Sequence, residues 1–258
     1  MNSSSVSVAV IGCGSGGSTI ADMLAKAGMG KLVLVDPDKL ESGNLKRHVL
    51  TMDYVGMNKA EAMGIYLASV SGCEVVTVGE KFNGLPVEID VVACCADSDL
   101  CCQLVNDYCL RHWIPAVYAG VYGAAETAEV ITVLPGITPC YACYEREGPD
   151  PEPTQEKYTN PDYDPTKAHH HEGLWGDVLM AAAIQFRAIL KVIEIEERIA
   201  VANKGRENRG IFYGCFGELW ADLNPLMLVS LRPPYTAEFP KQPRGCAVCS
   251  DDFSKLTV

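Results

Sequence analysis

A glycine-rich turn near the start of the chain constrains its fold more than any other feature. The residues Gly12-Cys13-Gly14-Ser15-Gly16-Gly17 follow an apolar run at 6–11 and lead into a stretch at 16–27 with apolar side chains at helical spacing. Glycines between a strand and a helix let backbone N–H groups and the helix N-terminus face a phosphate group or an adenosine. The turn therefore predicts a nucleotide-binding α/β fold, although a tight turn without a ligand has the same pattern.

The alternation of strand-like and helix-like segments continues along the chain. Apolar runs typical of strands lie at residues 6–11, 31–35, 74–78, 87–94, 114–118, 129–134 and 226–231. Helical spacing is found at residues 16–27, 59–69, 100–111 and 177–202. Near-continuous apolar strands that alternate with helices indicate a doubly wound, mostly parallel, Rossmann-like α/β sheet.

Changes in composition divide the expected single domain, residues 1–258, into three parts. Residues 6–147 are the expected nucleotide-binding half, and the proline-rich residues 148–176 are interpreted as a loop or lid. A long helix, the late strand and a final cysteine pair follow in residues 177–258. The run His169-His170-His171 is interpreted as solvated, because adjacent histidines on a loop rarely converge on one metal ion.

Charge and hydropathy exclude several classes of partner. The formal net charge of −12 at pH 7 argues against nucleic acid or an anionic membrane surface. No apolar run reaches the roughly 18 residues that cross a bilayer, and the first residues lack a basic, signal-like segment. We therefore expect a cytoplasmic protein whose cysteines are reduced.

Four of the 12 cysteines stand apart from the others, which are interpreted mostly as small buried side chains. They form two C-x-x-C pairs, Cys140 with Cys143 and Cys246 with Cys249. Two thiolates so closely spaced suit one face of a tetrahedral zinc ion. The 102 residues between the pairs exceed the gap of a zinc ribbon. The spacing favours zinc and leaves redox-active or merely buried dithiols open.

Acids and cations that follow the expected strands distinguish ATP from NAD. Asp36 ends the second strand, where a dehydrogenase would use an acid to hold the NAD ribose. Arg47 and Lys59 come next, and a triphosphate needs such cations to offset its charge. Asp97 follows another strand, at the edge where open α/β sheets bind ligands and where a carboxylate can hold Mg²⁺. The set favours ATP with magnesium, with Asp97-Ser98 as a mere helix cap the alternative for that acid.

Further strings of residues extend this ordered pattern. They are Leu32-Val33-Leu34-Val35-Asp36-Pro37-Asp38, Asn44-Leu45-Lys46-Arg47-His48, Gly56-Met57-Asn58-Lys59-Ala60, Ala96-Asp97-Ser98 with Asn106, and Pro139-Cys140-Tyr141-Ala142-Cys143. In order and spacing they resemble the ThiF/MoeB/HesA superfamily, the E1-like enzymes that adenylate ubiquitin-like proteins and sulfur carriers. The resemblance is dense over residues 6–143, resumes at 177–191 with Gln185, Ala188 and Lys191, and returns at 246–249.

The resemblance implies a role for each matched residue. Asp36 would bind the ATP ribose, and Asn44, Arg47 and Lys59 would contact the phosphates. Asp97 would hold Mg²⁺, and together with Arg47 and Lys59 it would form the catalytic set. The full set of nucleotide-binding residues would be Gly12, Gly14, Ser15, Gly17, Asp36, Asp38, Asn44, Arg47, Lys59 and Asp97. A structural zinc ion would be held by Cys140, Cys143, Cys246 and Cys249.

The implied reaction is attack of a C-terminal glycine carboxylate on the α-phosphorus of ATP, with release of pyrophosphate. The carboxylate is already an anion, so positioning and charge neutralisation do most of the work and no general base is needed. The implied partners are a ubiquitin-like or sulfur-carrier protein that ends in Gly-Gly, and a second E1-like chain, identical or different, in a dimer.

Three departures from the family pattern qualify this expectation. Members usually carry an N-terminal arginine that reaches the ATP of the other subunit, and this sequence shows none, so another arginine or another chain would supply it or activity would be reduced. Residues 144–214 hold no cysteine for a thioester, and Cys215 comes next. Ser15 stands where some members have glycine.

Three alternative functions stay open: adenylation of a peptide or small-molecule carboxylate, a non-catalytic partner subunit, and an NAD(P)-dependent oxidoreductase. The cation set and the cysteine pairs argue against the last.

Overall fold

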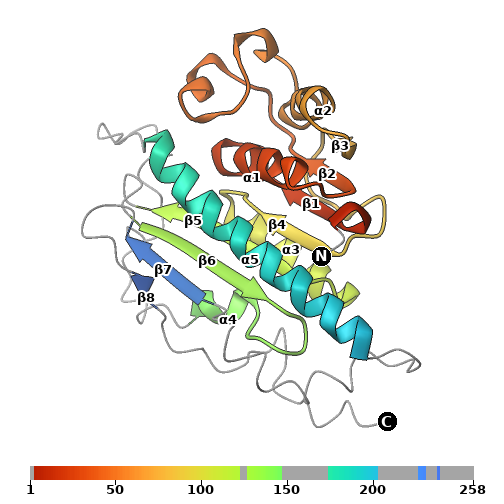
Figure 1. Ribbon diagram of the computed structural model, residues 1–258. Coiled ribbons are helices and arrows are strands. Elements are labelled where there is room, and N and C mark those ends of the chain that lie inside the picture. Colours follow the sequence, from red (N-terminus) through yellow and green to blue (C-terminus); the bar gives the residue numbers. More distant parts are fainter. Residues whose placement is uncertain (1–2, 123–126, 147–173, 203–225, 231–236, 239–258) are drawn as a thin grey trace.

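In the part of the chain that the structure describes, a twisted sheet of eight strands lies at the centre (Figure 1). The computed structural model describes residues 3–122, 127–146, 174–202, 226–230 and 237–238. The strands of these segments are β1 (Ser7–Ile11), β2 (Lys31–Val35), β3 (Glu74–Val78), β4 (Val91–Cys94), β5 (Ala116–Tyr122), β6 (Thr127–Val133), β7 (Leu226–Ser230) and β8 (Ala237–Glu238).

The strand order is β3-β2-β1-β4-β5-β6-β7-β8. The first five strands in this order pair in parallel, as expected from their continuous apolar sequences. Strands β5 to β8 pair in antiparallel fashion and extend one edge. The chain leaves β1 toward β2 on one side and later returns to β4 on the other. This switch point lies above the carboxyl end of β1, where open α/β sheets bind their ligands.

Helices cover both faces of the sheet, so the doubly wound prediction is confirmed. They are α1 (Ser15–Lys26), α2 (Lys59–Val70), α3 (Asp99–His112), α4 (Tyr141–Arg146) and α5 (Trp175–Ala202), with short 3₁₀ turns η1 (Ser3–Ser5), η2 (Ser42–Arg47) and η3 (Met52–Tyr54). Helix α5 crosses the sheet beside α1 on one face (Figure 1). Alternate strand residues such as Val8 and Leu32 pack with α1, α2 and α5, whereas Ala9 and Val33 pack with α3 and α4.

Several boundaries differ from the predicted ones, each for a local reason. The strand predicted at 87–94 begins only at Val91, because the carboxylate of Asp90 accepts hydrogen bonds from Ser7 N–H (2.8 Å) and Ser7 Oγ (2.7 Å) at the ladder's edge. Helix α4 and the 3₁₀ turn η2 were not predicted, because six residues are too few to establish a helical period. The late strand is present as β7, paired with β6.

Some expectations concern residues outside the described ranges. These are most of the proline-rich loop at 148–176, the histidine run within it, Cys215, and the second cysteine pair, Cys246 with Cys249. Within the part of the chain that the structure describes, no helix combines the length and the apolar character needed to span a membrane.

Candidate nucleotide site

Two glycines of the turn are required by close backbone packing. Gly12 has a φ of +87°, and its N–H donates to Val35 O over 2.8 Å. A Cβ on Gly12 would lie 2.9 Å from Cys95 O, and a Cβ on Gly17 only 1.7 Å from Gly12 O. The two glycines therefore let β1, α1 and the end of β4 approach one another, which makes their role structural.

The other side of the turn is open. A Cβ on Gly14 or on Gly16 would meet no atom within 4 Å. Gly14 is the N-cap of α1, where no side chain caps the helix, and Ser15 is the first helical residue. The first N–H groups of a 12-residue helix are thus left for a ligand. Their partial positive charge suits a phosphate group or another electron-rich part of a nucleotide.

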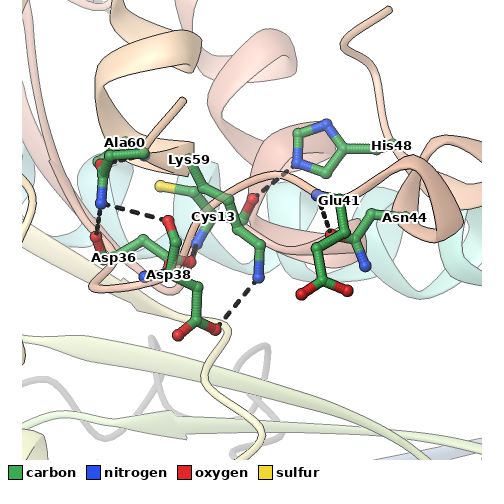
Figure 2. Close-up of polar contacts among 9 residues, drawn as sticks. Cys13, Asp36, Asp38, Glu41, Asn44, His48, Lys59 and Ala60 are labelled. Atoms are coloured by element: carbon green, nitrogen blue, oxygen red, sulfur yellow. Dashed lines mark hydrogen bonds and ion pairs between the residues drawn. The ribbon is translucent and has the colours of Figure 1, made fainter. Parts of the chain in front are cut away.

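Asp36 is fixed between this turn and the end of β2 (Figure 2). Asp36 is buried, with only 4% of its surface exposed. Oδ2 accepts from Cys13 N–H over 2.6 Å, and Oδ1 accepts from Asp38 N–H over 2.8 Å. Burial raises the pKa of Asp36, while these two N–H groups and Lys59 favour the carboxylate. Each oxygen keeps a second lone pair, so the carboxylate can still accept from ribose hydroxyls.

Lys59 is the first residue of α2, and its side chain lies near Asp36 and the glycine turn. Its side chain is 14% exposed, and its Nζ lies 3.2 Å from Oδ2 of Asp38, a side chain that is 68% exposed. The ammonium group acts electrostatically on Cys13, Asp36 and His48, which places its charge beside the turn. An ion pair with so exposed an acid is weak, so a phosphate can replace Asp38 as the partner of Lys59.

The position of Lys59 depends on Asn58, a residue for which the sequence analysis gave no role. Asn58 is the N-cap of α2, and its Oδ1 accepts from Ala60 N–H (2.9 Å) and Glu61 N–H (3.1 Å). Its Nδ2 donates to Asp36 O over 2.8 Å, so one side chain joins α2 to the end of β2. An asparagine before a helical stretch is a common capping signal, and that signal could have revealed it.

The turn η2 carries Asn44 and Arg47. The Oδ1 of Asn44 accepts from Glu41 N–H over 3.0 Å, and the Glu41 side chain accepts from Asn44 N–H in return (Figure 2). The amide NH₂ of Asn44 is the part left for a ligand. Arg47 is half-buried at the last position of η2 and forms no ion pair with any described residue. Its guanidinium group is therefore available to a phosphate.

Asp97 lies in the segment that leads from β4 into α3. The pair Asp97-Ser98 does contain the cap of α3, and the capping residue is Ser98, whose Oγ accepts from Cys101 N–H over 3.4 Å, rather than Asp97. Asp97 is exposed. Burial raises the pKa of the Cys101 thiol to about 11, and the charges of Asp97 and Asp36 contribute. Asp36 follows β2 and Asp97 comes after β4, and both strands pair in parallel with β1, so both acids lie at the carboxyl edge of the sheet.

The first cysteine pair has the geometry of half a zinc site. Cys140 Sγ and Cys143 Sγ are 3.8 Å apart, and both residues are buried. A tetrahedral zinc ion with Zn–S bonds of about 2.3 Å separates its sulfurs by roughly 3.8 Å, so the pair fits this metal. Among the described residues no three histidine, cysteine or acidic side chains are grouped to hold a metal. The pair could be joined only by ligands outside those residues.

Gln185 ties α5 to the strand ends beside the site. Its Nε2 donates to Cys94 O (3.2 Å) and Val117 O (2.9 Å), and its Oε1 accepts from the Cys95 thiol (3.3 Å). In the sequence, Gln185 is part of a motif, and its contacts are not indicated there. The contact joins residues about 90 positions apart, which no local pattern can reveal.

His48 joins η2 to the glycine turn. Its Nε2 lies 2.8 Å from Cys13 O (Figure 2). Its Nδ1 lies 3.2 Å from the backbone nitrogen of Leu50. A carbonyl oxygen can only accept and an N–H can only donate, so the ring is neutral with its proton on Nε2. Burial lowers the pKa of His48, and the positive charge of Lys59 lowers it further. The hydrogen bond to the Cys13 carbonyl acts in the opposite direction, because it favours the protonated ring.

Comparison with known proteins decides the family. The model of the ThiF family matches residues 2–208. The chain belongs to the ThiF family. Curated relatives include "Ubiquitin-like modifier-activating enzyme 5" of Drosophila willistoni, 31% identical over 154 residues, and of Aedes aegypti, 31% identical over 156 residues. Each match covers 53% of this chain and 38–39% of the relative, so the chain aligns with well under half of those proteins.

Solved structures share the fold of this ThiF-family chain. Escherichia coli MccB with MccA-N7isoASN superposes with a TM-score of 0.71 at 23% identity, over 96% of this chain and 68% of MccB. The same enzyme with ATP gives a TM-score of 0.69 at 24% identity, over the same shares of the two chains. The described residues therefore have the same doubly wound fold as these structures.

The neutral state of His48 makes the stability of this ThiF-family chain depend on pH. An unfolded histidine has a pKa of about 6.5, and the folded pKa lies below it. The contribution of His48 is full above about pH 6.5 and is lost as the pH falls toward the folded pKa, because only the unfolded chain takes up the proton. Chemical denaturation at pH 7.5 and pH 5 should therefore show a larger loss of unfolding free energy for the wild type than for His48→Gln. Equal losses would contradict a neutral His48.

Proposed function

We propose that this chain is an ATP-dependent adenylyltransferase that activates the C-terminal carboxylate of a ubiquitin-like or sulfur-carrier protein. One observation carries the proposal: in a chain of the ThiF family, the open N-terminus of α1 lies beside Asp36, which is held at the end of β2. An acid for a ribose and free helical N–H groups for phosphates meet at the switch point of the sheet.

The proposed reaction needs no proton transfer. An oxygen of the carboxylate forms a bond to the α-phosphorus of ATP, the bond from this phosphorus to the bridging oxygen breaks, and pyrophosphate leaves with the electron pair. The product is an acyl-adenylate, a mixed anhydride. Since the nucleophile is already an anion, the chain must align it and neutralise the growing negative charge.

The cations of the site are arranged for this task. Among the described residues Arg47 has no competing ion pair, and the ion pair of Lys59 is with the exposed Asp38. Asn44 offers an amide NH₂ from the same turn as Arg47. The phosphate oxygens of ATP would bind these three side chains. The side chains would then surround the departing pyrophosphate, where negative charge develops.

Asp97 fits a magnesium ligand. Its carboxylate is exposed and is not used as a helix cap, and like Asp36 it follows the carboxyl end of a strand that pairs in parallel with β1. Oxygen ligands are those that Mg²⁺ prefers, and the ion commonly binds through one carboxylate and the phosphates of a nucleotide. Magnesium held here would offset charge on the departing pyrophosphate.

The choice of a ubiquitin-like substrate follows the names of the curated relatives, which are 31% identical to this chain in matches that cover 53% of it. MccB, whose fold this chain shares, was crystallised both with ATP and with MccA. Adenylation of a peptide carboxylate is therefore the second candidate. A dimer with an identical or a related E1-like chain belongs to the proposal, because an arginine from a second subunit would complete the cations.

The test is ATP–pyrophosphate exchange, which reports adenylate formation without knowledge of later steps. The acceptors are Gly-Gly-ended β-grasp proteins, the same proteins without their last glycine, and MccA. We expect exchange only with a protein that keeps its Gly-Gly end. Exchange with MccA alone would assign a peptide substrate, and no exchange with any acceptor despite ATP binding would favour a non-catalytic subunit.

Zinc is predicted at one ion per chain, held by Cys140, Cys143, Cys246 and Cys249. Four thiolates leave no open position for water, so the ion would be structural and its binding energy would add to folding. Metal analysis of freshly purified, reduced protein should give one zinc, and Cys140→Ser should reduce this content. Cys94→Ser, at another buried cysteine, should keep the zinc. Zinc-free wild-type protein would refute the site.

A further inference from the structure

We propose that His48 is a positioning residue that aims the Gly14 N–H of the glycine turn at the bound nucleotide. The inference rests on the proposed function, because it concerns the same nucleotide site. It gives a role to a side chain that would itself touch neither the nucleotide nor the acceptor carboxylate. Three features of the structure carry it: the planarity of one peptide group, the two contacts of the imidazole, and the open side of the turn.

The carbonyl of Cys13 and the N–H of Gly14 belong to the same peptide group. A trans peptide is planar, so its C=O and N–H point in opposite directions. His48 Nε2 donates to Cys13 O over 2.8 Å. Fixing the carbonyl toward His48 therefore fixes the Gly14 N–H in the opposite direction, at the N-cap of α1.

The turn is open next to Gly14, so a ligand can approach its N–H group. A Cβ on Gly14 would meet nothing within 4 Å, so the turn is unobstructed there. The Gly14 N–H donates to no group in the described part of the chain. A donor held in place at a helix N-terminus before a phosphate arrives requires no reorganisation when it binds.

The imidazole itself is immobile. His48 is 3% exposed, and its Nδ1 accepts from Leu50 N–H over 3.2 Å, so both ring nitrogens are engaged. The opposite flank of Cys13 is held as well, because its N–H donates to Asp36 Oδ2. Two side chains from separate segments thus fix both peptide groups of Cys13. Since His48 directly follows Arg47, the same contact sets the turn against the η2 segment that carries the phosphate-binding cation.

Two substitutions separate the contact with the turn from the contact with Leu50. In His48→Gln the amide nitrogen occupies a position close to Nε2, so the donor to Cys13 O is kept and the acceptor for Leu50 N–H is lost. In His48→Asn the amide oxygen occupies a position close to Nδ1, so the acceptor is kept and the donor is lost. Each variant therefore removes one of the two hydrogen bonds of the ring.

The experiment is calorimetric titration of the full chain with Mg-ATP, without an acceptor. We expect His48→Gln to bind with nearly the wild-type Kd and His48→Asn to bind roughly tenfold more weakly, the effect of one hydrogen bond. Thermal melting of each variant gives its stability separately. If His48→Asn melts below the assay temperature, the titrations of all three proteins are repeated at a temperature at which this variant is folded.

The outcomes are distinct. Equal binding by wild type and both variants overturns the positioning role, and so does weaker binding by the glutamine variant than by the asparagine variant. Equal weakening of both variants also overturns it, because the role of His48 would then be structural support of the site. A wild-type chain that binds no Mg-ATP contradicts the proposed function itself, a result that differs from all of these.

Discussion

Replacing Asp97 with alanine should reduce ATP–pyrophosphate exchange at least roughly a hundredfold. The carboxylate is proposed to hold magnesium where negative charge develops on the departing pyrophosphate. By analogy with the loss of one oxyanion donor, its removal should raise the barrier by at least about 2.7–4 kcal/mol. Asp97→Asn should behave similarly, because an amide keeps the shape of the side chain and loses its charge. The measurement is the exchange rate at saturating ATP.

The fold of these variants should be intact. Asp97 is exposed, and Ser98 rather than Asp97 caps α3, so stability should stay within about 0.5 kcal/mol of the wild type. Asp99→Ala is the matched control, an exposed acid two residues further along, in the first turn of the same helix. It should keep wild-type exchange. Full exchange by Asp97→Ala would show that the metal is held elsewhere.

Replacing Gly17 with alanine should destabilise the fold by at least about 3 kcal/mol, the upper range for overpacking. The new Cβ would lie 1.7 Å from Gly12 O, and both groups belong to rigid backbone at the point where α1 leaves β1. The helix would have to move outward by more than an ångström, on the order of the shortfall from a normal contact. Thermal unfolding should show a melting temperature lower by roughly 6–12 °C.

Gly16→Ala tests whether this cost comes from close packing or from the loss of a glycine. Its Cβ would meet nothing within 4 Å, and alanine favours a helix over glycine by about 1 kcal/mol. Its melting temperature should equal or exceed that of the wild type. A Gly17→Ala protein as stable as Gly16→Ala would mean that the turn and the helix are not in contact in solution.

The sequence predicted the doubly wound sheet because buried parallel strands leave a strong signal. Runs such as residues 31–35 are apolar at every position, and the helices between them show a clear period. It also placed Asp36 and Asp97 at the ends of strands, and in the structure both follow strands that pair in parallel with β1, at the carboxyl edge of the sheet. The strand at 87–94 was predicted four residues too long, because the contact of Asp90 with Ser7 joins distant parts of the chain.

Contacts across long sequence separations explain what the sequence did not reveal in the site. His48 contacts Cys13 35 positions away, and Gln185 contacts residues of β4 about 90 positions away. Neither contact leaves a local pattern, because an imidazole or an amide in a sequence does not indicate which carbonyl it will meet. Asn58 differs, since its capping role is local and was available in principle. The zinc prediction stays a prediction, with one of its two pairs described.

Calorimetric titration of the purified chain with Mg-ATP and with NAD tests the central claim most directly, because a glycine turn and an acid at the end of the second strand are shared by sites for both nucleotides. We predict saturable binding of Mg-ATP and no binding of NAD, because Lys59 lies beside the turn, Arg47 is available to a phosphate and Asp97 is exposed. Asp36→Ala should abolish the ATP signal in the same experiment. Tight binding of NAD without binding of ATP would contradict the account.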